Sequence, residues 1–112
     1  MYAERPRSVF IARGGEEMIK LVHESGETVK WDGLSLSVTP GRNSSPVFRN
    51  PGVHKFGEDG EPLSNLYPTL REGVELEIFR TSRGKNLVVD NIYHVVLEHD
   101  PSGVRLVDMN TR

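Results

Sequence analysis

The chain of 112 residues carries 36% hydrophobic and 27% charged residues and has a formal net charge of −2. This length and composition indicate one globular domain and exclude a disordered protein, and the near-neutral charge argues against a dedicated duplex-binding domain. The absence of cysteine excludes disulfides and thiolate metal sites. The charged start and the lack of a long apolar run predict neither a signal peptide nor a membrane span, so we expect a cytoplasmic protein.

The first 39 residues predict a meander of up to four strands. Short apolar runs at 8–12 and 18–23 are separated by Gly14-Gly15, and a turn follows at 24–27. Helical periodicity is absent from this part of the chain. Residues 8–39 are therefore expected to form successive antiparallel strands.

The clearest local pattern is Asp32-Gly33, which separates two alternating runs. Asp-Gly is typical of a two-residue type I′ hairpin, because both central positions of that turn need a positive φ. After the turn, apolar and hydroxyl side chains alternate along residues 34–39. This alternation predicts a half-buried strand whose hydroxyl face is turned to solvent.

Residues 40–73 interrupt the β pattern. Five of the seven prolines lie in this stretch, which shows neither a strand nor a helix period. A loop of this length inside a domain is usually functional or disordered. It nevertheless carries more apolar side chains than a linker needs, so we expect parts of it to pack on the domain or on a partner.

Strands resume after Gly73 and continue to residue 108. Alternation predicts strands at 74–79 and 93–98, short apolar segments predict strands at 87–89 and 104–107, and a turn is expected at 81–85. Asp90-Asn91 predicts a tight turn, and a continuous strand over 87–99 with a bulge there is the alternative. Together the patterns predict an all-β fold, namely a small antiparallel barrel or sandwich of seven to eight short strands with one long irregular loop, in a single domain over residues 1–112.

No catalytic, nucleotide-binding or zinc-binding motif is present in the sequence. The acidic residues Glu58, Asp59 and Glu61 lack the spacing of calcium ligands and predict a solvated loop tip. His94 and His99 are an odd number of residues apart on one expected strand, which directs them to opposite faces. We therefore expect no metal site, no cofactor and no enzymatic activity.

Two surfaces are expected to contact partners, namely the long loop and the turn at 80–85. The turn gathers three cations, a pattern that suits phosphates or an acidic groove, although cations are also common at solvated turns. The long loop contributes apolar and aromatic side chains that lie outside any strand pattern. The candidate partner-binding residues are Phe48, Val53, His54, Phe56, Tyr67, Arg80, Arg83 and Lys85.

Three stretches of the C-terminal third resemble a known family. They are Leu70-Arg71-Glu72-Gly73-Val74-Glu75-Leu76-Glu77-Ile78, Val88-Val89-Asp90-Asn91-Ile92-Tyr93-His94-Val95-Val96 and Asp100-Pro101-Ser102-Gly103. Together they resemble the ending of head–tail connector proteins of tailed phages, the stopper or tail-completion group. The sequence departs from the family pattern at Asn91, where glycine is usual, and in its additional turn at 83–85. The resemblance implies a small β-barrel with a long loop, assembled as a ring between portal and tail, and it assigns no functional residue.

The leading expectation is a non-enzymatic assembly or adaptor domain that contacts other proteins. The specific form of this expectation is a phage head–tail connector component in a ring of identical copies. A small β-barrel that binds nucleic acid through Arg80, Arg83 and Lys85 is the first alternative, and it is not favoured by the net charge. A small inhibitor of another enzyme is the second. The family resemblance adds the virion to the cytoplasm as an expected location.

Overall fold

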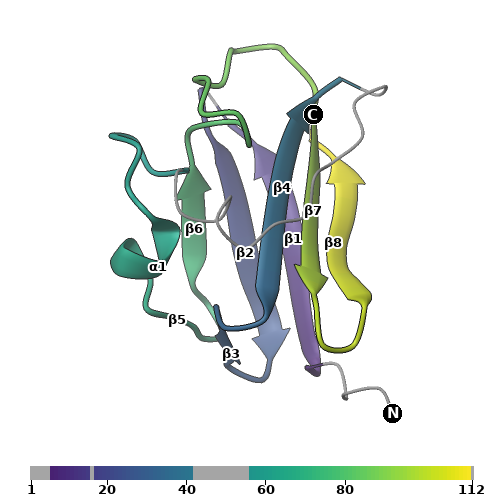
Figure 1. Cartoon of the computed structure of the whole chain (residues 1–112). Coiled ribbons are helices and arrows are strands. Elements are labelled where there is room, and N and C mark those ends of the chain that lie inside the picture. The colour runs from purple at the N-terminus through teal and green to yellow at the C-terminus, as the bar shows by residue number, and fades with distance from the viewer. Residues whose placement is uncertain (1–5, 16, 42–55, 112) are drawn as a thin grey trace.

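The computed structural model describes residues 6–15, 17–41 and 56–111, which form eight strands and one helical turn (Figure 1). The strands are β1 (Ser8–Gly14), β2 (Ile19–Gly26), β3 (Val29–Lys30), β4 (Leu34–Pro40), β5 (Thr69–Leu70), β6 (Glu75–Ile78), β7 (Tyr93–His99) and β8 (Val104–Asn110), and the helix is α1 (Leu63–Leu66). They form three sheets, in the orders β1-β2-β6, β3-β5 and β4-β7-β8, and every pair is antiparallel. The expected all-β fold of seven to eight antiparallel strands is confirmed.

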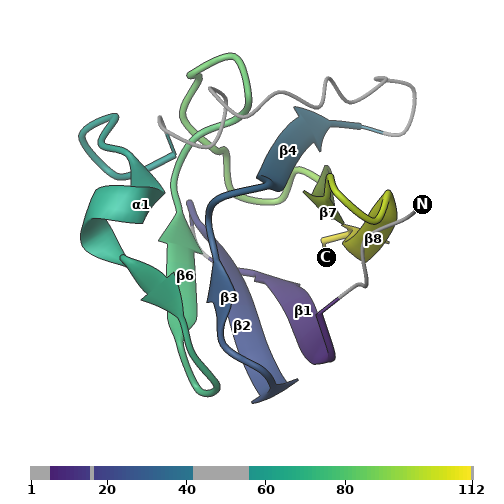
Figure 2. The same ribbon diagram turned by 60° about the horizontal axis from the view of Figure 1, so that its bottom comes forward.

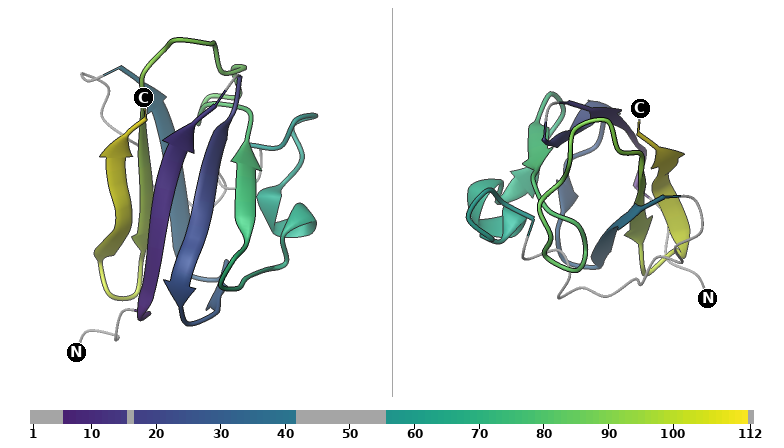
Figure 3. Two further views of the ribbon diagram at one scale, coloured as in Figure 1. Left: turned by 180° about the vertical axis from the view of Figure 1, so that it is seen from behind. Right: turned by 90° about the horizontal axis from the view of Figure 1, so that it is seen from above.

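The two three-stranded sheets surround one hydrophobic core, while α1 and β5 flank β6 (Figures 2 and 3). Leu21 of β2, Leu76 of β6 and Leu97 of β7 are at most 1% exposed. His23 is also buried, with its ring stacked on that of Phe10 at 4.4 Å between centroids. Among the described strands, the hydrogen-bonded ladder does not continue around the whole core.

The turn at Asp32-Gly33 is present, but the hairpin predicted around it is wrong. The N–H of Leu34 donates to the carbonyl of Trp31 at 2.9 Å, and Gly33 has a φ of 83°. Asp32 does not have a positive φ, so the turn is not of type I′. The chain passes here from one sheet to another, because β3 pairs with β5 and β4 pairs with β7.

The prediction of a solvent-facing hydroxyl side for β4 is also wrong. Ser35, Ser37 and Thr39 are at most 9% exposed, so both faces of this strand are buried. The hydroxyl of Ser35 donates to the carboxylate of Asp100, whereas the hydroxyls of Ser37 and Thr39 have no hydrogen-bond partner in the described structure. The alternation of serine and threonine with leucine is the same whether the hydroxyl side faces solvent or a covering segment, so it does not by itself identify a solvent face.

Residues 87–92 form neither the predicted short strand nor the alternative continuous strand. The N–H of Val88 donates to the hydroxyl of Tyr93 at 2.8 Å, which replaces a bond to a neighbouring strand. The tight turn lies one residue earlier than predicted, since the N–H of Asn91 donates to the carbonyl of Val88 and Asp90 has a φ of 70°. The predicted strand at 93–98 and the hairpin that joins it to β8 are present.

The described part of the long loop, residues 56–73, packs on the domain. Phe56, Leu63 and Leu70 are fully buried members of the core, which confirms that parts of the loop pack on the domain. This part is less irregular than predicted, because it contains α1 and β5. Trp31 also holds this part of the loop against the domain, since its indole N–H donates to the carbonyl of Tyr67 at 2.6 Å.

Gly26, at the end of β2, has a φ of 106° and no room for a side chain. A Cβ atom there would overlap the carbonyl oxygen of Arg7 and lie 2.8 Å from the Cα of Ser8, and backbone atoms cannot rotate away. We expect Gly26→Ala to lower the free energy of unfolding by about 1–3 kcal/mol and to displace the start of β1. Gly73→Ala is the control, because Gly73 has a φ of 90° but nothing within 4 Å of its Cβ position. Equal losses in urea denaturation of the two variants would contradict the steric explanation.

Candidate functional site

The predicted partner-binding residues do not form one surface in the described structure. Phe48, Val53 and His54 lie outside the described residues. Phe56 is in the core, with 0% of its side chain exposed, and its carbonyl accepts the N–H of Phe79 at 2.8 Å. Tyr67 is half-buried against the same core.

Arg80 is directed at the protein's own backbone. Its guanidinium donates to the carbonyls of Gly57 at 3.3 Å, Glu58 at 3.0 Å and Gly84 at 3.2 Å. Arg83 and Lys85 are exposed on the same turn. Two exposed cations therefore remain of the three that the sequence brings together.

The turn that follows β6 is fixed to β4. The backbone N–H of Ser82 donates to the carbonyl of Val38, and the hydroxyl of Ser82 accepts the N–H of Val38, both at 2.8 Å. These two bonds connect the sheet of β6 to the sheet of β4 on one side of the core. The turn is thus held against the domain and does not project into solvent.

On the other side of the core, β1 and β8 lie side by side without a ladder between them (Figures 1 and 3). Both strands run in the same direction in these views, and some of their Cα atoms approach within 8 Å. β1 pairs only with β2, and β8 pairs only with β7. We call this unpaired boundary the β1–β8 seam.

Successive residues of an antiparallel strand direct their N–H and carbonyl groups to opposite sides, so every second residue of β1 has backbone groups that β2 does not use. His23 exchanges bonds with the segment before β6, since its N–H donates to Val74 and its carbonyl accepts from Gly73. The neighbouring residue Val22 therefore bonds to its partner on β1, Ile11. The N–H and carbonyl groups of Phe10 and Ala12 consequently point toward the seam.

The same alternation applies to β8. The N–H of Thr111 donates to the carbonyl of Tyr93 at 2.8 Å. Met109 lies two residues earlier and therefore also directs its backbone groups toward β7. The N–H and carbonyl groups of Asp108 and Asn110 therefore point toward the seam. Both edges of the seam present unused donors and acceptors, an arrangement that proteins usually cover or block.

A hollow lies at each end of the seam. The lower one, about 540 Å³, lies between the first residues of β1 and of β8 and includes Val9 and Leu106. The upper one, about 570 Å³, lies between Gly14 at the end of β1, Thr111 after β8, and the turn that contains Val88 and Val89. The two hollows and the edges between them form one elongated surface.

Exposed apolar side chains are concentrated along this surface. Among the described residues, five large apolar side chains are strongly exposed, at 39–57%. Four of them lie in the hollows or on β8 between them, and the fifth, Leu66, is on α1. The four are Val9, Val88, Val89 and Met109. Such a concentration is typical of an interaction surface, whereas isolated exposed apolar residues are ordinary.

Charges differ between the two ends of the seam. Arg7 and Arg105 are the charged residues in the lining of the lower hollow, and Asp90 is the charged residue among the described lining of the upper one. Arg7 is exposed, and its guanidinium makes no hydrogen bond or ion pair with another described residue. The described lining is therefore positive at the lower end and negative at the upper end.

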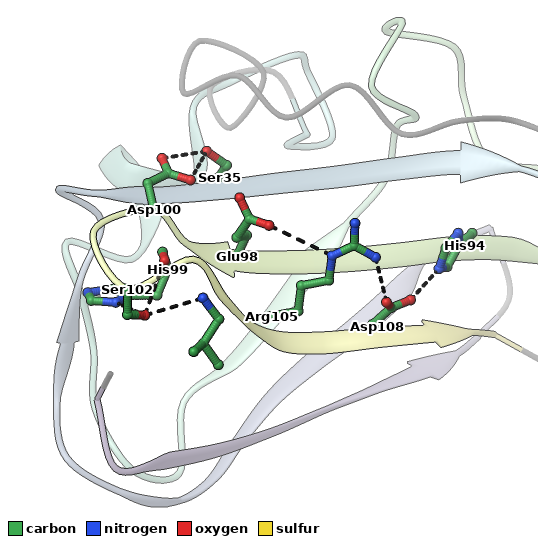
Figure 4. Close-up of polar contacts among 9 residues, drawn as sticks. Ser35, His94, Glu98, His99, Asp100, Ser102, Arg105 and Asp108 are labelled. Atoms are coloured by element: carbon green, nitrogen blue, oxygen red, sulfur yellow. Dashed lines mark hydrogen bonds and ion pairs between the residues drawn. The ribbon is translucent and has the colours of Figure 1, made fainter. Parts of the chain in front are cut away.

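A polar network lies beside the seam on the outer face of β7 and β8 (Figure 4). The carboxylate of Asp108 contacts Nε2 of His94 at 2.6 Å and the guanidinium of Arg105 at 2.7 Å, and Arg105 also lies 3.7 Å from Glu98. The hydrogen bond with His94, followed by that with Arg105, lowers the pKa of Asp108 below its ordinary value. The hydrogen bond with Asp108 raises the pKa of Arg105.

Asp108→Asn is expected to change the pH dependence of stability. A carboxylate with a lowered pKa stabilises the fold at pH values above the ordinary pKa of about 4, and this contribution is lost as the pH falls through the lower value of the folded state. Because the side chain of Asp108 is 40% exposed, we expect a difference below about 1 kcal/mol at pH 7. Urea denaturation from pH 7 to 2 should show the wild-type advantage shrinking below about pH 4. An advantage that is constant over this range would contradict the role of the carboxylate charge.

Of the remaining polar pairs in Figure 4, that of Ser35 and Asp100 connects β4 to the β7–β8 turn, and the others close this turn. Nδ1 of His99 lies 2.7 Å from the hydroxyl of Ser102, which also accepts the N–H of Val104. Within residues 6–15, 17–41 and 56–111, no three histidine, aspartate or glutamate side chains are gathered as a metal site would require. In the same ranges, no helix has the length and apolar character needed to cross a membrane.

Comparisons with protein-family models, with curated proteins and with solved structures found no match for this chain. The seam was not predicted from the sequence, because Val9 lies inside an expected strand and Val88 and Val89 were expected to form one. The adjacent valines Val88 and Val89 form a short apolar run, and such a run does not show whether its side chains are buried or exposed.

Proposed function

We propose that this protein is a non-enzymatic assembly or adaptor domain that binds another protein at the β1–β8 seam. The observation that carries the proposal is the concentration of Val9, Val88, Val89 and Met109 along one boundary that also exposes backbone donors and acceptors. Apolar contacts supply affinity at such a surface, and edge groups supply orientation.

A head–tail connector of a tailed phage is the specific role that we propose within this class. It is supported by the resemblance of residues 70–78, 88–96 and 100–103 to that family. In this role the protein would form a ring of identical copies, and it would occur in the cytoplasm during assembly and afterwards in the virion. Arg80 does not favour a nucleic-acid role, because its guanidinium is occupied by three carbonyls.

Photo-crosslinking in the cells that produce the protein tests the docking function. We expect a benzoyl-phenylalanine at position 9 or 109 to yield a covalent adduct with one defined protein, identified by mass spectrometry. The matched control is position 66 on α1, where the native side chain is 47% exposed but distant from the seam. The absence of adducts at positions 9 and 109, or equal adducts at all three positions, would contradict the proposal.

A further inference from the structure

We propose that the β1–β8 seam takes up a single extended strand of the partner, about seven residues long, with an apolar centre, a carboxylate at one end and a cation at the other. This inference rests on the proposed docking function and specifies the chemistry of the partner. The contact would be a strand addition that joins the two sheets on their open side.

The orientation of the unused backbone groups favours an extended chain. Phe10 and Ala12 on one edge, and Asp108 and Asn110 on the other, direct their N–H and carbonyl groups into the same boundary. One extended chain placed between the edges can pair with both of them.

The spacing of the edges determines what must move. A strand that pairs on both sides needs edges about 9.6 Å apart, which is twice the ladder spacing of about 4.8 Å. Because some Cα atoms of β1 and β8 lie within 8 Å of each other, the seam must widen by at least roughly 2 Å at those positions. No ladder bond opposes this movement, whereas the other side of the core is held by the bonds between Ser82 and Val38.

The length of the incoming strand follows from the edges. β1 and β8 each have seven residues, so a strand of about seven residues spans the seam. Met109 pairs with the core-facing Val95 and lies on the inner side of the seam, whereas Val9 precedes the buried Phe10 and lies on the outer side. The apolar face of the strand would therefore contact Met109 and the upper hollow with Val88 and Val89, and its opposite face would lie beside Val9.

The charges at the ends determine its polarity. Arg7 at the lower end suits a carboxylate, and Asp90 at the upper end suits a cation. Both edges run from the lower to the upper end, and antiparallel pairing is slightly the more stable. The partner strand is thus expected to begin with its cation at the upper hollow and to end with its carboxylate at the lower one.

Amide hydrogen exchange on the whole protein tests the inference directly. The probe is the peptide Lys-Val-Thr-Val-Thr-Val-Glu at millimolar concentration, which combines an extended backbone for pairing with an apolar face for the side-chain contacts. We expect the peptide to slow exchange at Phe10, Ala12, Asp108 and Asn110 by at least about tenfold, while Ile11 and Met109, already bonded to neighbouring strands, change little. The control peptide Lys-Thr-Thr-Thr-Thr-Thr-Glu, which lacks the apolar side chains, is expected to give no protection.

Variants of the protein locate the contact. We expect Met109→Asp to weaken binding of the valine peptide by about tenfold or more, because Met109 lies on the side that the valines would face, and Leu66→Asp to leave it unchanged. A spin label at the glutamate end of the peptide should broaden the amide resonances of Val9 and Leu106 rather than those of Val88 and Thr111. Broadening at the upper end instead would overturn the assigned polarity.

The outcomes separate this inference from the proposed function. If the valine peptide protects none of the edge amides, strand addition is wrong, although crosslinked adducts at positions 9 and 109 would still support docking. Protection that rises with protein concentration in the absence of peptide would show that a second copy occupies the seam, which also overturns the inference. Missing adducts would instead count against the docking function itself.

Discussion

Phe56→Ala is expected to lower the free energy of unfolding by about 3–5 kcal/mol, the usual cost of removing a fully buried phenylalanine. The side chain is 0% exposed and belongs to the same core as Leu63 and Leu70. Its removal deletes a large apolar surface and leaves a cavity that the surrounding sheets cannot fill. A domain of ordinary stability has about 5–15 kcal/mol in total, so the variant should be close to unfolding at 37 °C.

Urea denaturation followed by the fluorescence of Trp31 measures this effect. Val88→Ala is the matched control, because Val88 is 57% exposed and its truncation is expected to cost less than about 0.5 kcal/mol. If Phe56→Ala has wild-type stability and loses only partner binding, the residue is a contact residue and its position in the core is wrong.

Arg80→Met should reduce the free energy of unfolding by about 2–3 kcal/mol. Hydrogen bonds to charged groups are worth about 1.5–3 kcal/mol each, but the carbonyls near this half-exposed side chain can be partly rehydrated after its loss. The three carbonyls belong to residues 57, 58 and 84, so the guanidinium ties the segment after Phe56 to the turn after β6. Methionine keeps an unbranched apolar stem but is shorter than arginine, and it removes the guanidinium together with its charge and its donors.

Two further variants sharpen the test of Arg80. Arg80→Lys should recover little of the lost stability, because a single ammonium cannot reproduce the planar fork of the guanidinium. Arg83→Met, on the same turn but exposed, should change stability by less than about 0.5 kcal/mol. A similar loss for Arg80→Met and Arg83→Met in urea denaturation would refute the role of the three hydrogen bonds.

Most strands could be predicted from the sequence, because alternation is a local property. The segments that become β4, β6 and β7 show it, those that become β1, β2 and β8 contain short apolar runs, and the structure contains all six strands. Pairing could not be predicted in the same way. Asp32-Gly33 has the chemistry of a hairpin turn, but β3 pairs with β5 and β4 pairs with β7, two partners that lie far along the chain.

The site was less predictable than the fold. The local sequence around Arg80 is that of a solvated turn. Only the folded chain brings the carbonyls of Gly57 and Glu58 to its guanidinium. Phe56 lies among prolines and charges, so its place in the core depends on packing that no local period encodes. The β1–β8 seam joins strands from opposite ends of the chain and has no local sequence signature.

The passage of the chain from one sheet to the other at Asp32-Gly33 has a kinetic consequence. β2 can complete its sheet only when β6 has been made, and β4 can pair only with β7, much later in the chain. Closing such distant loops costs entropy before any contact is gained, so folding should take milliseconds to seconds rather than microseconds. During synthesis, the edges of β2 and β4 stay exposed until the ribosome has released the C-terminal strands, and this interval is when the protein is most vulnerable to aggregation.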